Sequence, residues 1–300
     1  MKIGILSEQS IDRLDWIRDH GFGSFQWNRF QDSNIAQASS SDWQERTKRW
    51  GEEIQRRSLR LSAIGVSYCN SMAPSNQEEV RFLMRRGIEV ASLLEVKTVS
   101  CFSGAVIQTV ENRRRGASSE RLFEEFIPEV CDYWRPLVDM AIDFGVRIAF
   151  ENCPQGPYHL PVMGYNLMSQ PANWSIFFHA MDRSNVGLEW DPSHLICLGV
   201  DPVENLKEFG ARVFHVHAKD AELQSEVIRR YGRCHPEAAR HRFPGLGSAD
   251  WRLIIQTLRE VGYDSDLTIE GWHDPVMKGD RETEGLLGAK QHLESMLGKR

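Results

Sequence analysis

Short apolar runs rich in β-branched residues alternate with longer amphipathic stretches along the whole chain. The apolar runs predict buried strands, and they lie at 2–6, 22–27, 59–66, 96–101, 146–151, 185–191, 212–218 and 267–271. The stretches between them carry apolar residues at helical spacing, such as Ile11, Leu14 and Ile17. This spacing predicts helices, which we expect at 10–20, 42–57, 76–93, 119–144, 171–182, 201–209, 248–262 and 280–297.

A strand followed by a helix, repeated along the chain, predicts a parallel sheet with helices packed outside it. Eight such units in 300 residues favour one α/β domain spanning 1–300, a single (β/α)8 TIM barrel. An open doubly wound sheet is the alternative, but no glycine-rich phosphate loop follows the first predicted strand. The segment 222–247 is longer than an ordinary strand-to-helix connection, and we expect it to form a lid-like loop.

Four of the predicted strands end in residues that commonly bind metal ions: Glu151, Asp191, His217 and Glu270. In a barrel of this kind the active site lies at the carboxyl ends of the strands, and strands five to eight are neighbours around half of it. Carboxylates and imidazole together suit hard or borderline divalent ions. The pattern predicts one divalent metal site, and polar residues that merely end strands are the alternative.

The two glutamates of this set come from predicted strands five and eight, so they can approach a shared ion from opposite sides. A substrate held between them would have one base on each face. One carboxylate would remove a proton next to a carbonyl and the other would return it, with the ion as a Lewis acid. Glu151 and Glu270 are therefore the predicted catalytic pair, and a salt bridge at a strand end is the alternative for either one alone.

Other residues that follow the strand ends are candidates for substrate contact. His194 follows the sixth predicted strand and Lys219 the seventh, with a capping or solvent-facing role as the alternative. Arg242 shortly precedes a Pro-Gly turn, where its guanidinium could clamp hydroxyls, a carboxylate or a phosphate. Trp272 and His273 follow the eighth strand, where an aromatic ring can stack on the face of a sugar.

The composition limits the partner and the compartment. A net charge of −6 and a pI near 6.0 disfavour nucleic acid, because such binding needs a basic surface. No apolar run is long enough for a membrane helix, and the first residues show no secretory signal. The six cysteines are scattered without a CxxC pair, as in reduced cytosolic proteins. We therefore expect a cytoplasmic enzyme, either a monomer or a homo-oligomer.

Five segments carry a further likeness: FEN (150–152), WDPSHL (190–195), HVHAKD (215–220), RFPGLGSADW (242–251) and TIEGWHDP (268–275). They resemble the xylose isomerase-like TIM-barrel superfamily of sugar-phosphate isomerases and epimerases, which includes ketose 3-epimerases and inosose dehydratases. The resemblance implies that the four strand-end residues bind one divalent ion, with Mn²⁺ expected first and Mg²⁺, Co²⁺ or Zn²⁺ as alternatives. It also implies that Glu151 and Glu270 act as the acid/base pair, and that His194 and Arg242 touch a small carbohydrate substrate.

Two departures from this family pattern widen the range of expected reactions. Ketose 3-epimerases carry an acidic residue where this chain has Pro157, and relatives often read IEHEDP where this chain has IEGWHDP. In addition, CFSG (101–104) resembles members that act on 3-keto-glycosides by β-elimination. We predict a metal-dependent sugar or sugar phosphate isomerase or epimerase. A lyase or dehydratase of a keto-sugar, inosose or 3-keto-glycoside is the alternative, ahead of a sugar-binding protein or an apurinic-site endonuclease.

Overall fold

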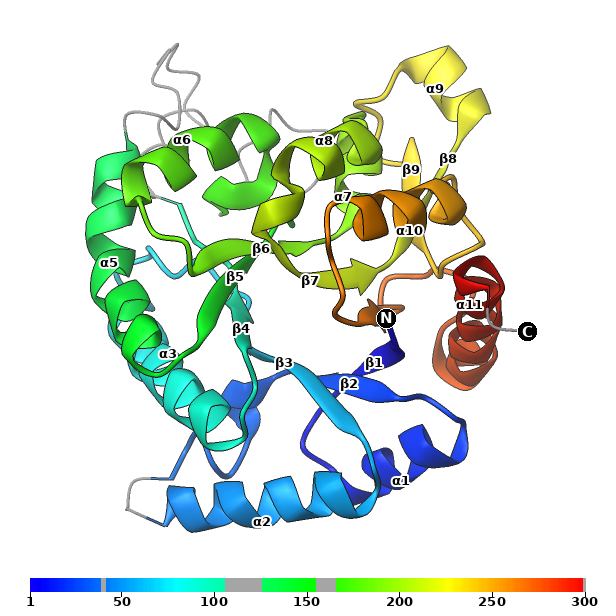
Figure 1. The fold of residues 1–300 in the computed structure, drawn as a ribbon. Helices are drawn as coiled ribbons and strands as arrows, with labels where there is room; N and C mark the ends of the chain where they lie inside the picture. The colour runs from blue at the N-terminus through cyan, green and yellow to red at the C-terminus, as the bar shows by residue number, and fades with distance from the viewer. Residues whose placement is uncertain (39–41, 106–125, 155–165, 299–300) are drawn as a thin grey trace.

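Eight parallel strands form a closed barrel in the computed structural model, which describes residues 1–38, 42–105, 126–154 and 166–298 (Figure 1). The strands are β1 (Ile3–Ser7), β2 (Ser24–Trp27), β3 (Arg60–Ser67), β4 (Thr98–Cys101), β5 (Arg147–Glu151), β6 (Val186–Trp190), β7 (Val213–Ala218) and β10 (Leu267–Ile269). Their order around the barrel is β1, β10, β7, β6, β5, β4, β3 and β2. The predicted (β/α)8 barrel is confirmed, and the eight strands lie close to their expected positions.

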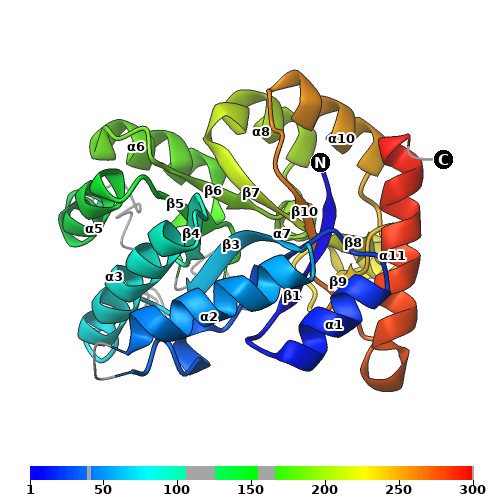
Figure 2. The same cartoon turned by 60° about the horizontal axis from the view of Figure 1, so that its bottom comes forward.

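Helices surround this barrel, as Figure 2 shows from a second direction. They are α1 (Ile11–Asp19), α2 (Trp43–Arg56), α3 (Gln77–Leu93), α5 (Ile127–Asp143), α6 (Pro171–Met181), α7 (Pro192–Leu198), α8 (Pro202–Phe209), α10 (Trp251–Glu260) and α11 (Glu282–Leu297). The short α7 was not predicted. Residues 119–125 of a predicted helix and Pro157 lie outside the described residues. Within the described ranges, every helix is too short or too polar to cross a bilayer.

The helices cover the barrel because each carries an apolar stripe that needs burial. In α3 the predicted stripe is confirmed, since Val80, Leu83, Met84 and Ile88 are all buried. Burying an aliphatic side chain of this size stabilises the fold by about 1.5–3 kcal/mol. Gly87 lets α3 approach β3 closely, because a Cβ at this position would come within 2.6 Å of the Val66 side chain.

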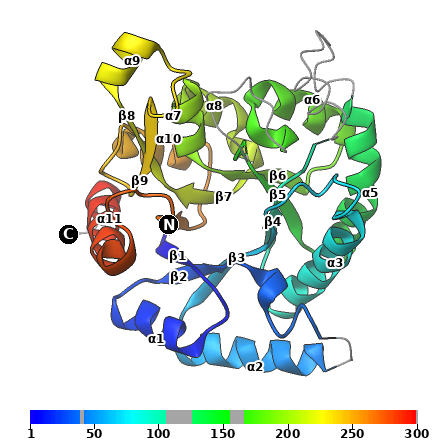
Figure 3. The same cartoon turned by 180° about the vertical axis from the view of Figure 1, so that it is seen from behind.

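The segment 222–247 is more ordered than the predicted loop. The strands β8 (Asp220–Leu223) and β9 (Ala239–Arg242) pair in an antiparallel hairpin, and α9 (Ser225–Tyr231) lies between them. The pairing satisfies backbone groups that a long irregular loop would leave exposed. None of the residues of α9 is buried, and α9 projects beyond the ring of helices (Figure 3). The expectation of a plain loop is therefore corrected, and a lid function for the hairpin stays a prediction.

Candidate metal centre and active site

The four predicted metal ligands lie together at one end of the barrel. Glu151 ends β5, His217 lies near the end of β7, and Asp191 and Glu270 directly follow β6 and β10. These four strands are consecutive around the barrel, so their carboxyl ends meet on one side of its mouth. Each residue offers one ligand atom, these atoms all lie within 4.8 Å of one another, and all four residues are buried. We call this set the quartet.

The quartet presents donor atoms that the protein does not itself satisfy. Asp191 Oδ2, His217 Nδ1 and Glu270 Oε2 are buried, and none has a hydrogen-bond partner among the described residues. His217 Nδ1 lies 3.0 Å from Glu270 Oε2 and 3.4 Å from Glu151 Oε1. Burying several carboxylates together is costly unless cations pair with them. The donor set therefore fits a divalent ion that accepts both carboxylate oxygen and imidazole nitrogen.

Contacts within the site keep both glutamates ionised. Burial by itself would raise the pKa of Glu151, but the neighbouring imidazoles of His194 and His217 outweigh it and hold this pKa below its usual value. Burial also opposes ionisation of Glu270, yet the charge of Lys219 holds the pKa of Glu270 well below its usual value. Each glutamate is therefore available as a proton acceptor near neutral pH.

Lys219 is almost completely buried, with 2 % of its surface exposed, and its amine lies at the edge of the quartet. Its Nζ donates to Glu270 Oε1 at 2.8 Å and lies 3.4 Å from His273 Nδ1. Burial would lower the pKa of Lys219, but Glu270 and the neighbouring carboxylates raise it above its usual value. The site therefore holds a fixed ammonium group beside one of the predicted bases.

His194 closes the quartet from the side of α7. Its Nε2 lies 3.3 Å from Asp191 Oδ2 and 3.5 Å from Glu151 Oε1. Burial would lower the pKa of this imidazole, but Cys153 and Asp191 outweigh it and raise the pKa to about 10. Asp191 also caps α7, since its Oδ1 accepts from the backbone N–H of Ser193 at 2.7 Å. The helix that the sequence did not predict thus positions the predicted His194.

A cavity of about 790 Å³ opens onto this end of the barrel. Four of the five predicted substrate-binding residues line it: His194, Lys219, Trp272 and His273. Its lining also includes three members of the quartet and, on another side, the apolar or aromatic Leu6, Tyr68, Val80, Leu83 and Phe102. Trp272 is 52 % exposed, so its ring is available to a ligand. The cavity combines a charged site with an apolar wall, as binding sites for small molecules do.

Arg242 is not among the residues that line the cavity. Its Nε donates to Asp274 Oδ2 at 3.0 Å and its Nη1 to Glu222 Oε2 at 2.5 Å. Successive residues of a strand point to opposite faces, so β9 sends His241 to the cavity and Arg242 away from it. Arg242 is thus held by Asp274 and Glu222 in this structure, and its expected contact with the substrate stays a prediction. The sequence analysis missed His241, whose pKa lies well below the usual value, chiefly because of burial.

The two neighbours on β9 should therefore respond differently to substitution. We expect His241→Ala to lower kcat/KM by about 1–2 kcal/mol in transition-state terms, as for a lost hydrogen bond to a ligand. Arg242→Ala should instead lower the stability by about 1–3 kcal/mol, because the buried Asp274 loses its ion pair and keeps only its backbone N–H donors. Steady-state kinetics and thermal unfolding measure the two effects. If Arg242→Ala instead lowered kcat/KM at unchanged stability, and His241→Ala lowered only the stability, Arg242 would be the residue that contacts the substrate.

A second polar cluster inside the barrel was also missed by the sequence analysis. Glu189 on β6 is fully buried, and its carboxylate accepts hydrogen bonds from Gln26, Tyr68 and His215. Burial opposes ionisation of Glu189, but His217 and His215 hold its pKa below its usual value. The available signal was an acidic residue inside an apolar strand, two positions before Asp191 and so on the same strand face.

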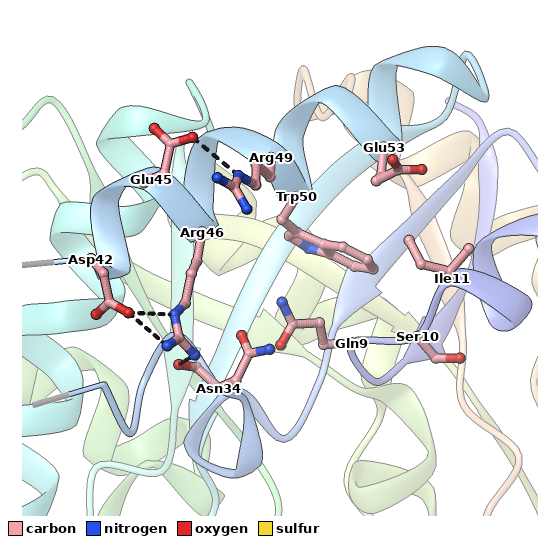
Figure 4. Close-up of a pocket in the computed structure, with 10 residues that line it drawn as sticks. All are labelled: Gln9, Ser10, Ile11, Asn34, Asp42, Glu45, Arg46, Arg49, Trp50 and Glu53. Atoms are coloured by element: carbon pink, nitrogen blue, oxygen red, sulfur yellow. Dashed lines mark hydrogen bonds and ion pairs between the residues drawn. The ribbon is translucent and has the colours of Figure 1, made fainter.

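A separate cavity of about 630 Å³ lies between α2 and the start of α1 (Figure 4). Figure 4 shows its two arginines paired with carboxylates four positions earlier in the chain: Arg46 with Asp42 at 2.6 Å and Arg49 with Glu45 at 3.0 Å. Its described lining contains no histidine or cysteine. These paired surface charges contrast with the buried donor atoms of the quartet, which lack hydrogen bonds, so we place the candidate active site in the barrel.

Comparisons with known proteins agree with this architecture. Among curated relatives, an inosose dehydratase from Clostridium botulinum is 34% identical over 107 residues, which cover 34% of this chain and 35% of the relative. A solved D-psicose 3-epimerase has a TM-score of 0.70 and 15% identity, covering 99% of this chain and 100% of the other. The IOLI protein, solved with a bound zinc atom, has a TM-score of 0.65 and 20% identity, and the alignment covers 99% of this chain and 96% of the other. These structures show a shared fold.

The family comparison covers nearly the whole chain. Residues 14–296 match the sequence profile of the family described as xylose isomerase-like TIM barrel. The match begins within α1 and ends within α11, so it includes the strands that carry the quartet. The observed closed barrel of parallel strands is the architecture that this description names. The chain therefore belongs to the xylose isomerase-like TIM-barrel family.

Proposed function

We propose that this protein is a divalent-metal-dependent isomerase or epimerase of a sugar or sugar phosphate. The observation that carries the proposal is a pair of ionised glutamates, one at the end of β5 and one directly after β10, whose carboxylate oxygens lie 3.4 Å and 3.0 Å from His217 Nδ1. Both glutamates line the cavity, so both can reach one bound substrate. Two carboxylate bases at one carbonyl-binding centre suit proton transfer at the neighbouring carbon.

The quartet would hold the metal ion. Carboxylate and imidazole ligands together accept Mn²⁺, which the family resemblance puts first, as well as Mg²⁺, Co²⁺ and Zn²⁺. The IOLI protein, which shares the fold, was solved with a bound zinc atom, and this supports a divalent ion in a barrel of this kind. When bound, the ion supplies a Lewis acid that polarises the substrate carbonyl and acidifies the neighbouring C–H group.

The protein's own groups would then bind the substrate and move its proton. Glu151 and Glu270 come from strands separated by β6 and β7, so they face a substrate from two directions. One takes the proton from the carbon next to the carbonyl. The other returns a proton to the opposite face of the same carbon in an epimerisation, or to the neighbouring carbon in an isomerisation. His194, His241 and Lys219 donate hydrogen bonds to substrate oxygens, and Trp272 offers an aromatic surface to a sugar ring.

A lyase that acts by β-elimination on a keto-sugar, inosose or 3-keto-glycoside is the second candidate. The specific observation is the buried ammonium of Lys219, 2.8 Å from Glu270 and in the lining of the same cavity. Glu270 would remove the proton from the carbon next to the carbonyl, a double bond would form to the adjacent carbon, and the carbon–oxygen bond on that adjacent carbon would break. Lys219 could protonate the departing oxygen. The similarity of one third of the chain to an inosose dehydratase supports this candidate.

In both proposed functions the protein acts on a small carbohydrate. We propose that it does so in the cytoplasm. All six cysteines are free thiols, as expected in a reducing compartment. The net charge of −6 supports neither a nucleic-acid partner nor an anionic membrane surface.

Incubation of the Mn²⁺-loaded protein with ketoses, ketose phosphates, inososes and 3-keto-glycosides in D₂O distinguishes the two candidates. We expect NMR to show deuterium at a retained C–H position of an isomerised or epimerised product. Loss of water or of the aglycone would assign the protein to the lyases instead. Absence of both solvent exchange and product across the panel would contradict the proposed proton chemistry.

A further inference from the structure

A buried polar layer lies directly beneath the quartet, and the proposed reaction does not use it. Glu189 on β6 is its centre, and the neighbouring strands contribute Gln26 from β2, Ser100 from β4 and His215 from β7. Glu189 lies opposite Glu151 of β5 and His215 of β7 in the strand register. A carboxylate without solvent exposure in a barrel interior is costly and needs a specific compensation.

The compensation is a complete set of donors around Glu189. Its Oε1 accepts from Gln26 Nε2 at 2.7 Å and from His215 Nδ1 at 3.0 Å. Its Oε2 accepts from the hydroxyl of Tyr68 at 2.8 Å. His217 Nε2 lies 3.2 Å from the same Oε1. Glu189 therefore contacts a member of the quartet from below while the quartet faces the cavity above.

These contacts determine which nitrogen of His217 carries its proton. An ionised carboxylate only accepts, so the group of Gln26 that faces Glu189 at 2.7 Å is its amide nitrogen. The amide oxygen of Gln26 then faces His217 Nε2 at 2.8 Å. Both neighbours of Nε2 are acceptors, so Nε2 carries the hydrogen and donates it. Neutral His217 consequently has its lone pair on Nδ1, the atom that faces Glu151 and Glu270.

His215 is fixed by the same layer, and this explains why the cluster is not itself a metal site. The spacing of Glu189, His215 and His217 would allow a metal ion. However, His215 Nδ1 donates to Glu189, and its Nε2 is hydrogen-bonded to the hydroxyls of Ser62 at 3.1 Å and Thr268 at 3.0 Å. An ion here would have to break the hydrogen bonds of both His215 nitrogens and of His217 Nε2, whereas the quartet has buried donor atoms without hydrogen bonds.

We propose that Glu189 is a positioning residue for the metal centre, which holds His217 in the tautomer whose Nδ1 binds the ion. The inference rests on the metal centre of the proposed function. A carboxylate that accepts the second N–H of a ligating histidine orients the ring and strengthens it as a ligand. Gln26 shares this contact and is itself oriented by Glu189. Glu189 therefore acts through His217 and does not touch the substrate.

The test is the affinity of the metal-free protein for Zn²⁺, measured by chelator competition in wild type and in Glu189→Gln. The variant keeps the side-chain shape but replaces an acceptor with an amide that can donate to His217 Nε2, so the other tautomer becomes accessible. We expect the affinity to fall by about 10–100-fold, as for loss of a group that supports a metal ligand. Ser62→Ala is the matched control, since Ser62 bonds His215 in the same layer but does not contact His217. Its affinity should stay within about threefold of wild type.

A second measurement does not depend on whether a variant folds. In ¹⁵N-labelled Zn²⁺-bound wild type, NMR should show His217 with a protonated Nε2 and metal-bound Nδ1. Metal on Nε2, or a wild-type affinity in folded Glu189→Gln, would overturn the proposal, as would an equal loss of affinity in Ser62→Ala. The two experiments measure Zn²⁺ affinity and the protonation of the His217 nitrogens, and neither depends on turnover. A protein that converts no carbohydrate in the D₂O panel would refute the proposed function and leave the role of Glu189 intact.

Discussion

Glu151→Gln or Glu270→Gln should lower turnover by about 10²–10⁴-fold, the usual contribution of a positioned acid/base group. Glutamine keeps the shape of the side chain and an oxygen that can face the metal ion, but it cannot accept the proton. Because each glutamate also belongs to the quartet, turnover is measured at saturating metal concentration, with bound metal determined in the same samples.

The difference between the two variants carries more information than the size of either loss. In an epimerase, the variant without the abstracting base should lose solvent exchange of the substrate proton altogether. The variant without the returning base should still exchange the proton while forming no product. For a lyase, one glutamate should control both exchange and elimination, and Lys219→Met should slow departure of the leaving group.

Glu79→Gln is the control for removal of a carboxylate from the cavity. Glu79 lies at the start of α3 and lines the same cavity, but it is exposed and does not belong to the quartet. Its turnover should remain close to that of wild type. If metal-replete Glu151→Gln and Glu270→Gln also turned over normally, neither carboxylate would move the proton, and His194, Lys219 and His273 would become the candidate bases.

The barrel was predictable because its signals are local. An apolar run such as 146–151 can be recognised without knowledge of its neighbours, and β5 was found at Arg147–Glu151. The fold rule then converts strand order into position: neighbouring strands end at the same side of the barrel. For this reason the residues of the quartet could be grouped from sequence alone, and the structure brings their donor atoms within 4.8 Å of one another.

The supporting contacts were not predictable because they join strands that are far apart in sequence. Gln26 and Glu189 are separated by 163 residues and meet only when the barrel closes. A glutamine on an early strand carries no local sign of such a partner. The orientation of Arg242 was not predictable for a different reason. Without the hairpin, the alternation along β9 was unknown, so the sequence could not show that His241 and not Arg242 lines the cavity.

His217→Ala should nearly abolish metal binding while the barrel stays folded. Loss of a group that only supports a ligand costs about 10–100-fold in metal affinity, so removal of the ligand itself should cost more than about 100-fold. Metal analysis after dialysis, and the rise of Tm on metal addition, measure the effect without a substrate. For wild type, a metal concentration of about 1,000 Kd should add about 4 kcal/mol of stability, whereas His217→Ala should gain little at the same concentration.

The comparison with His241→Ala makes this result specific to the quartet. His241 lines the same cavity, and its ring centroid lies 5.1 Å from that of His194, but His241 does not belong to the quartet. Removing either imidazole empties part of the cavity. Of these two histidines, it is His217 that presents a buried nitrogen toward two carboxylates. His241→Ala should therefore keep the metal and the metal-dependent rise in Tm. Full metal occupancy in His217→Ala would show that the ion binds elsewhere, and the two glutamates would then lose the centre that makes them a catalytic pair.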